Sequence, residues 1–171
     1  DIGALESELA SRIGPEPVAL LTSGSVEAGV SYLGDDELYI PSSNDRVYRF
    51  NTDGEIQYQI QVNGDVKSAT TLASDHTLYI ASTDFNLYAF NSNGVSLNNW
   101  PVSLGSEATA SVALYDELAF IGTSNGILQA IDATGQIVWN YNAGEAIYSS
   151  AAIDSEGNIF FITESGKLIS F

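Results

Sequence analysis

The sequence predicts an all-β fold that is built from four repeated antiparallel units. Three features recur with the same period of 40 or 41 residues. Two of them are apolar positions in successive strand patterns, and the third is a turn glycine. They are Ile40, Ile80, Ile121 and Ile162; Val47, Leu87, Leu128 and Leu168; and Gly54, Gly94 and Gly135. A fixed period of this length indicates a repeat architecture, in which each unit buries its faces against its neighbours.

Each unit contains four short strand patterns. In the second unit they are VKSATTLA, HTLYIAS, FNLYAFN and VSLNNWPVSL. Aromatic and β-branched residues alternate with other residues in the middle two, which is typical of a half-buried strand. The breaks NTDG, NSNG and DATG supply the Gly and Asn residues that tight hairpin turns favour. Four antiparallel strands in each repeat of ~40 residues predict the four-stranded blades of a β-propeller.

The N-terminal segment departs from the repeat. Leu5, Leu9 and Ile13 fall four residues apart in ALESELASRI, which predicts a short amphipathic helix, and GPEP ends it. We expect residues 1–16 to form this helix and a linker, and residues 17–171 to form the propeller. The expected blades are residues 24–63, 64–104, 105–143 and 144–171. Because no methionine stands at position 1, we also expect a processed chain or an excised piece.

The fourth unit ends at Phe171 with three strand patterns. The segment PVALLTSG precedes the first inner strand as IVWNYNAG precedes the fourth, so residues 17–23 are expected to complete the fourth blade as its outer strand. Such a split blade leaves no free strand edge. Two arrangements satisfy this pattern. The chain closes as a four-bladed ring, which the small inner-strand residues permit, or two copies form an eight-bladed ring as a homodimer.

Composition excludes several classes of partner and site. The chain has 5 Lys and Arg against 22 Asp and Glu, a net charge of −17. Nucleic acids and anionic membranes attract basic surfaces, so neither is an expected partner. No cysteine is present, which removes disulfides and thiolate sites. No apolar run reaches the ~18 residues of a membrane span.

Residues with catalytic or metal-binding chemistry are sparse. His76 is the only histidine, and its neighbour Asp75 recurs as Asp35 and Asp116, which indicates a repeated turn. The acidic stretches NTDGE and GDDE also read as turns, because they lack the alternating oxygen ligands of a calcium loop. We therefore expect no catalytic residues, no metal site and no cofactor. The chain contains the residue types of a Ser-His-Asp triad, but no sequence motif supports one.

The turns between the second and third strand patterns are the candidate binding elements. They differ from unit to unit where the strands agree, and functional residues are often found on loops. In propellers they share one face with the loops that lead into the next inner strand. The candidate binding residues are Asn44, Asp45, Arg46, Asp84, Phe85, Asn86, Asn125 and Glu164. The alternative is that these segments are ordinary polar turns with no role in binding.

Two units carry a family resemblance. LYIASTDFNLYAFNSNG with Trp100, and AFIGTSNGILQAIDATGQIVW ending at Trp139, resemble the repeats of PQQ-like propellers in the quinoprotein alcohol dehydrogenase-like superfamily. The first unit has Tyr58 where these have tryptophan, and packing between outer strands is the expected role of all three aromatics. The resemblance covers about Pro17 to Phe171.

The resemblance implies the blade fold. The superfamily has two branches, one of enzymes and one of non-catalytic proteins. Its enzymes use a vicinal cysteine disulfide, a calcium site and a catalytic Asp, and no such set is present here. The chain is therefore similar to the non-catalytic branch, which implies an extracytoplasmic scaffold that binds a protein or peptide through the loops around the channel. The alternatives are a fragment of a quinone- or carbohydrate-dependent enzyme, and a purely structural blade set in a larger surface protein.

Overall fold

The computed structural model describes residues 22–32, 34 and 37–171, and all structural statements below concern these residues. The expected helix at residues 4–13 and most of the expected strand at residues 17–23 lie outside this range. Thr22 and Ser23, the part of that segment that is described, are not in a strand.

Fifteen β-strands pair antiparallel in four sheets, which we call blades 1 to 4 in chain order. Blade 1 contains β1 (Ser31–Tyr32), β2 (Leu38–Ser42), β3 (Arg46–Phe50) and β4 (Ile56–Gln61). Blade 2 contains β5 (Thr71–Leu72), β6 (Leu78–Ala81), β7 (Asn86–Phe90) and β8 (Val102–Ser103). Blade 3 contains β9 (Ala113–Tyr115), β10 (Leu118–Gly122), β11 (Ile127–Asp132) and β12 (Ile137–Asn142). Blade 4 contains β13 (Ala152–Ile153), β14 (Ile159–Ile162) and β15 (Leu168–Ser170). The prediction of an all-β propeller with antiparallel blades is confirmed: in the described residues, blades 1 to 3 have four strands each and blade 4 has three.

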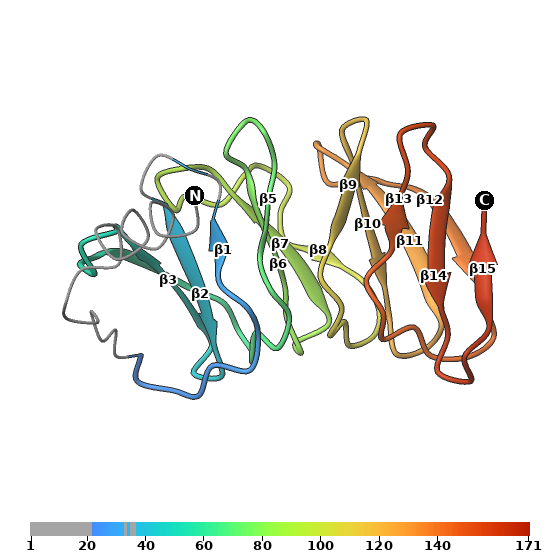
Figure 1. Ribbon diagram of the computed structural model, residues 1–171, viewed down its shortest axis with the longest axis horizontal. Helices are drawn as coiled ribbons and strands as arrows, with labels where there is room; N and C mark the ends of the chain where they lie inside the picture. The colour runs from blue at the N-terminus through green and yellow to red at the C-terminus, as the bar shows by residue number, and fades with distance from the viewer. Residues whose placement is uncertain (1–21, 33, 35–36) are drawn as a thin grey trace, which may run out of the picture.

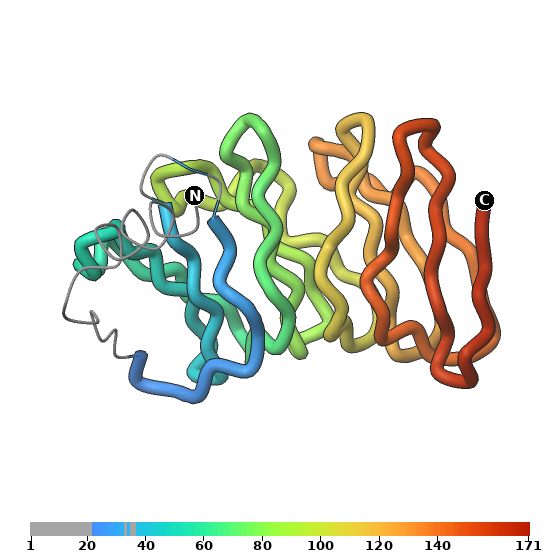
Figure 2. The backbone as a smooth tube through the Cα atoms, viewed as in Figure 1, coloured from blue at the N-terminus to red at the C-terminus, as the bar shows by residue number. Residues whose placement is uncertain are grey.

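The four blades stand side by side in an open row (Figure 1). The inner strand β1 contacts β5, and β9 contacts β13. Blades 1 and 4 lie at opposite ends of the longest axis, as the backbone trace in Figure 2 also shows. Of the two expected arrangements, the closed four-bladed ring is therefore not the one observed within this chain.

Apolar side chains between consecutive blades form the core. We call the side of a blade that faces the next blade its forward face, and the other side its backward face. Val47 on the forward face of blade 1 packs in one cluster with Ile80 and Tyr88 of blade 2. Leu87 of blade 2 packs with Ile121 of blade 3 in the same way. Each blade is thus stabilised by burial against its neighbours rather than by a core of its own.

Strand register corrects the repeat alignment in the fourth unit. Ile40, Ile80 and Ile121 pair with Tyr48, Tyr88 and Gln129, whereas the residue in that place in blade 4 is Phe161, which pairs with Ile169. Phe161 is buried, and Ile162 is 49% exposed. The predicted equivalence of Ile162 with the other isoleucines is wrong by one residue, because a shift of one position in a strand moves a side chain to the opposite face.

Aromatic side chains tie the outer strands to the next blade. Tyr58 donates its hydroxyl hydrogen to the carbonyl of Ser92 at 2.9 Å, and Trp100 donates its indole N–H to the carbonyl of Ala133 at 3.4 Å. Ser92 and Ala133 occupy the same hairpin turn in blades 2 and 3. In blade 3, Trp139 is 37% exposed and packs edge-on against Phe171 of blade 4 with ring centroids 5.1 Å apart. Each of the three aromatics thus makes a contact between adjacent blades.

Candidate binding face

The turn between the second and third strands of each blade is held against the loop that leads into the inner strand. Four equivalent backbone hydrogen bonds make this contact: from Ser43, Thr83, Ser124 and Glu164 to the carbonyls of Ser25, Asp65, Glu107 and Ala146. Their lengths are 2.8 to 3.0 Å. These turns and loops line one edge of the row, the lower edge in Figure 1. We call this edge the loop face.

Asn44 and Asp84 brace their own turns. Asn44 donates its amide hydrogens to the Tyr48 hydroxyl at 2.7 Å and to Ser23 Oγ at 2.6 Å. Asp84 accepts a hydrogen bond of 2.5 Å from the Tyr88 hydroxyl and one of 3.1 Å from the backbone N–H of Asn86. Burial, and then this bond to Asp84, raise the pKa of Tyr88 to about 12, so the hydroxyl stays a donor at neutral pH. These hydrogen bonds within the turns use some of the donor and acceptor atoms of Asn44, Asp84 and Asn86.

Phe85 has both an unusual backbone and an exposed ring. Its φ is 72°, and the residues in its place in the other turns are Asp45 (62°), Gly126 (84°) and Gly166 (84°). Positive φ is costly for a bulky side chain, and glycine adopts it freely. The Phe85 side chain is 51% exposed. A strained position that carries an exposed aromatic is a reason to look for a role in binding.

Arg46 is held flat along the neighbouring strand β4. Its Nε donates to Gln61 Oε1 at 2.9 Å, and its Nη1 donates to Gln59 Oε1 at 2.9 Å. Both partners are neutral, and the two ion pairs in the described part of the chain involve Arg49 and His76 instead. The guanidinium is therefore positioned by amides while its charge is not neutralised by a direct ion pair there.

The eight predicted residues form a strip rather than a single cluster, since each blade contributes its own turn. Asn125 and Glu164 are exposed, as Phe85 is, while the other predicted residues are half-buried. Tyr148, on the loop that leads into blade 4, is 51% exposed on the same edge, and sequence reasoning missed it. Its only sequence signal is an aromatic where the equivalent loops carry Lys67 and Thr109.

The loop face carries charges of both signs. Its carboxylates include Asp45, Asp65, Glu107, Glu145 and Glu164, and its basic residues include Arg46, Lys67 and Lys167. The hydrogen bond from the Ser165 hydroxyl, followed by that from Thr163, holds the pKa of Glu145 below its usual value. Glu145 is therefore ionised at neutral pH, on the same face as the exposed aromatic rings of Phe85 and Tyr148.

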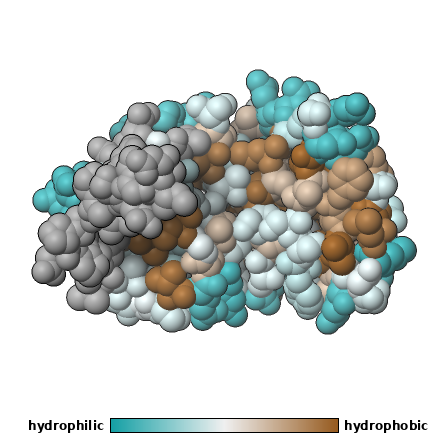
Figure 3. Space-filling model, viewed as in Figure 1, coloured by the Kyte–Doolittle hydropathy of each residue, from teal (hydrophilic) through white to brown (hydrophobic). Residues whose placement is uncertain are grey.

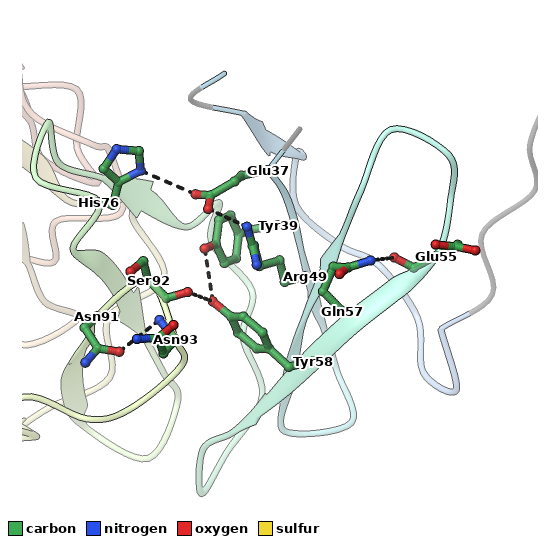
Figure 4. Close-up of polar contacts among 10 residues, drawn as sticks. All are labelled: Glu37, Tyr39, Arg49, Glu55, Gln57, Tyr58, His76, Asn91, Ser92 and Asn93. Carbon is green, nitrogen blue, oxygen red and sulfur yellow. Dashed lines mark hydrogen bonds and ion pairs between the residues drawn. The ribbon is translucent and has the colours of Figure 1, made fainter. Parts of the chain in front are cut away.

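A polar network lies near the opposite edge, at the junction of blades 1 and 2 (Figure 4). The buried Glu37 accepts a hydrogen bond from Arg49 Nη2 at 2.5 Å, and its other oxygen is 3.5 Å from His76 Nδ1. The Arg49 guanidinium lies 5.3 Å from the ring centroid of Tyr58. His76 has φ of 65° in the turn before β6, so the expectation of a turn histidine is met. The pairing with Glu37 was not predicted, because the two residues are 39 positions apart.

A cavity of about 510 Å³ opens between blades 2 and 3 on this second edge. Asp75, Asp116 and Glu117 contribute carboxylates to it, and Leu72, Tyr79 and Leu114 form its apolar part. Across residues 22–32, 34 and 37–171, no group of three or more His, Cys, Asp or Glu side chains is arranged to hold a metal ion. Over the same range, no helix is both long and apolar enough for a membrane crossing.

Comparison with known proteins identifies the family. Residues 6–171 match the profile of the family PQQ_2, which is described as outer membrane protein assembly factor BamB. The chain belongs to this family. A search of curated proteins finds no match.

Solved structures support the same fold. The crystal structure of BamB from Moraxella catarrhalis is similar with a TM-score of 0.74 and 16% identity, over 86% of this chain and 47% of that one. The computationally designed protein Ika4 gives a TM-score of 0.79 and 13% identity, over 93% of this chain and 98% of that one. Designed Ika8 gives 0.74 and 11%, over 86% of this chain and 45% of that one. The chain thus spans about the length of Ika4 and less than half of BamB and Ika8.

Proposed function

We propose that this chain is a non-catalytic scaffold that binds a protein or peptide partner through the loop face, in an extracytoplasmic compartment. Phe85 carries the proposal. A glycine would relieve the backbone strain at this positive φ, as Gly126 and Gly166 do in blades 3 and 4. Blade 2 instead has a large aromatic ring there, which is 51% exposed. Exposed aromatic rings that lie among polar side chains are typical anchors of protein recognition.

The remaining features of the face fit an extended partner. Phe85 and Tyr148 offer apolar anchors on different blades, and the carboxylates around them favour a partner with basic residues. Arg46 adds one positioned cation, which can donate to a carboxylate or a backbone carbonyl of the partner. The description of the family as an assembly factor supports a role in binding proteins. Its reference to the outer membrane supports the extracytoplasmic location.

A displayed library of random peptides tests this proposal directly, because it samples many partner sequences at once. Wild-type protein should enrich peptides that contain basic and aromatic residues. Their affinity should fall by about tenfold or more in Phe85→Gly, which removes the ring and keeps a turn that glycine adopts well. Arg46→Glu should weaken the same peptides.

Val95→Ala provides the matched control. Val95 is 59% exposed on the hairpin turn before β8, at the opposite edge from the loop face. Its replacement should leave peptide affinity unchanged. Equal affinity of wild-type protein, Phe85→Gly and Arg46→Glu for every enriched peptide would contradict binding through this face.

A further inference from the structure

The cavity between blades 2 and 3 combines negative charge with an apolar wall. Its volume of about 510 Å³ is within the range of ~300–1,000 Å³ that is typical of ligand sites. The exposed carboxylates of Asp75, Asp116 and Glu117 line it together with the half-buried side chains of Leu72 and Leu114. Figure 3 shows hydrophilic side chains along the upper edge of the molecule, with apolar ones below them, where Figure 1 places β9. The proposed function uses none of these residues.

The hydroxyl of Tyr79, which also lines the cavity, has no hydrogen-bond partner among the described residues. Tyr79 is only 6% exposed. In blade 1 the equivalent Tyr39 shares a hydrogen bond of 3.1 Å with the hydroxyl of Tyr58. Blade 2 has Trp100 in the place of Tyr58, and its indole N–H already donates to the carbonyl of Ala133. Because a buried hydroxyl without a partner is costly, this one favours a ligand that forms a hydrogen bond with it.

Basic residues of the chain do not neutralise the carboxylates of the cavity. No Lys, Arg or His is among the described residues that line it. Both ion pairs in the described part of the chain involve Glu37, which does not line it. Burial, and then the negative charge of Asp75, raise the pKa of Tyr79, so its hydroxyl is neutral at neutral pH and can accept a hydrogen bond. The cavity therefore favours a cationic ligand that donates hydrogen bonds.

The arrangement of the carboxylates favours an organic cation over a metal ion. A metal ion needs several oxygen atoms around one point. In the described part of the chain, no group of three or more His, Cys, Asp or Glu side chains is arranged in that way. A guanidinium carries several N–H donors in one plane, and its methylene stem packs along apolar side chains. This group therefore suits separate carboxylates, a hydroxyl and an apolar wall at the same time.

The junction of blades 1 and 2 holds a guanidinium of the chain itself near the same edge (Figure 4). Arg49 donates to the buried Glu37, and its guanidinium lies 5.3 Å from the ring centroid of Tyr58. By strand register, three positions of this junction correspond to residues that line the cavity: Tyr39 to Tyr79, His76 to Glu117, and Ser92 to Ala133. The cavity is thus the equivalent place between blades 2 and 3.

The two large side chains of that network have small counterparts at the cavity. Ala89 stands in the place of Arg49, and Thr77 stands in the place of Glu37. Their smaller side chains leave room at this edge, and blade 3 adds the carboxylate of Glu117 to it. The junction of blades 2 and 3 therefore lacks a guanidinium of its own and has space and negative charge for an external one.

We infer that this cavity binds the guanidinium of an arginine side chain from another polypeptide. Asp116 and Glu117 accept hydrogen bonds from its N–H groups, and the Tyr79 hydroxyl accepts a further one. Leu72 and Leu114 contact the methylene stem. A polypeptide is favoured over free arginine, because the three carboxylates of the cavity repel the α-carboxylate of the amino acid.

The site lies at the opposite edge from the loop face, so this inference does not depend on the proposed function. A single side chain makes few contacts, and we expect a dissociation constant of about 1 mM. Peptides that bind the loop face at micromolar concentrations therefore leave the cavity mostly empty.

Titration of the full chain with a capped tripeptide that has a central arginine, followed by heteronuclear NMR in ~150 mM salt, tests this inference. The chemical-shift changes should saturate and should be confined to residues 72–79 and 114–118, which include most of the lining. A tripeptide with a central glutamine should give no saturable change. A tripeptide with a central lysine, which lacks the planar set of donors, and free arginine should each bind at least about threefold more weakly.

Three variants locate the binding energy. Asp116→Asn combined with Glu117→Gln should weaken binding of the arginine tripeptide by about tenfold or more. Tyr79→Phe should weaken it by about threefold and should not lower the melting temperature, because the hydroxyl that it removes has no partner in the described part of the chain. Asp53→Asn removes an exposed carboxylate from a hairpin turn of blade 1 and is the matched control, which should bind as wild type does.

Several results would overturn the inference. They are the absence of saturable shifts up to about 20 mM tripeptide, shifts outside the cavity, and equal binding of the glutamine tripeptide. Equal losses in Asp53→Asn and in the Asp116→Asn, Glu117→Gln protein would point to general charge attraction and would also overturn it. A lysine tripeptide or free arginine that binds as tightly as the arginine tripeptide would overturn the assignment to an arginine side chain of a polypeptide.

Discussion

Leu128 and Leu168 occupy the same repeat position, but only Leu128 has a blade packed against it. Leu128 is 1% exposed in a cluster with Ile147 and Phe161, whereas Leu168 is 63% exposed. Leu128→Ala removes a fully buried side chain and leaves a cavity, which costs about 3 kcal/mol of the free energy of unfolding within the usual range of roughly 2–5. Leu168→Ala loses only about a third of that burial and opens no closed cavity, so its cost is at most about 1 kcal/mol.

Urea denaturation followed by fluorescence measures both costs. Leu128→Ala should lower the transition midpoint strongly, and Leu168→Ala should lower it slightly, with similar slopes. Costs that agree within about 0.5 kcal/mol would refute the assignment of Leu168 to a free forward face.

Three further predictions follow from individual contacts. Tyr58→Phe removes the donor to the Ser92 carbonyl and the acceptor for Tyr39, so the free energy of unfolding should fall by about 1–2 kcal/mol in urea denaturation, and an unchanged value would contradict this link. The Thr134 hydroxyl and then the N–H of Gln136 lower the pKa of Asp132, so its stabilising effect is present above the unfolded-state pKa and is lost as pH falls through the lower folded-state pKa. Melting temperatures should therefore fall less steeply with acid in Asp132→Asn than in wild type, and parallel curves would argue against this role. Titration with pyrroloquinoline quinone and calcium should leave the absorbance spectrum and the melting temperature unchanged, because no residue set for that chemistry was found, and a saturable shift would favour the enzymatic alternative.

The repeat made the fold predictable. Strand positions followed from alternation and turn glycines, and the packing of Leu87 and Leu128 followed from their period. The fourth unit was misaligned at Ile162 because its strand has isoleucine one residue later than the others. Both Phe161 and Ile162 are apolar, so only the pairing with β15 separates the buried side chain from the exposed one. The row of blades and the separation of its ends come from blade geometry, which the period does not specify.

The candidate site was predicted less completely. The turns that form the loop face could be located, since they interrupt the repeat at fixed places. The hydrogen bonds inside these turns could not be predicted, because the roles of Asn44 and Asp84 depend on tyrosine hydroxyls of the following strands. The positive φ of Phe85 could be inferred only from Gly126 and Gly166 in its place. Glu37 and His76 meet through blade packing, and neither residue has a local signal for the other.

Hydrogen exchange with and without an enriched peptide tests the central claim most directly, because it locates the bound surface on the whole chain. Exchange should be slower in the turns at residues 42–46 and 82–86 and in the loop at residues 144–150 when the peptide is present. The turns at residues 74–76, 91–94 and 115–117, on the opposite edge, should exchange at the same rate in both states. Protection confined to that opposite edge would contradict a scaffold that binds its partner through the loop face.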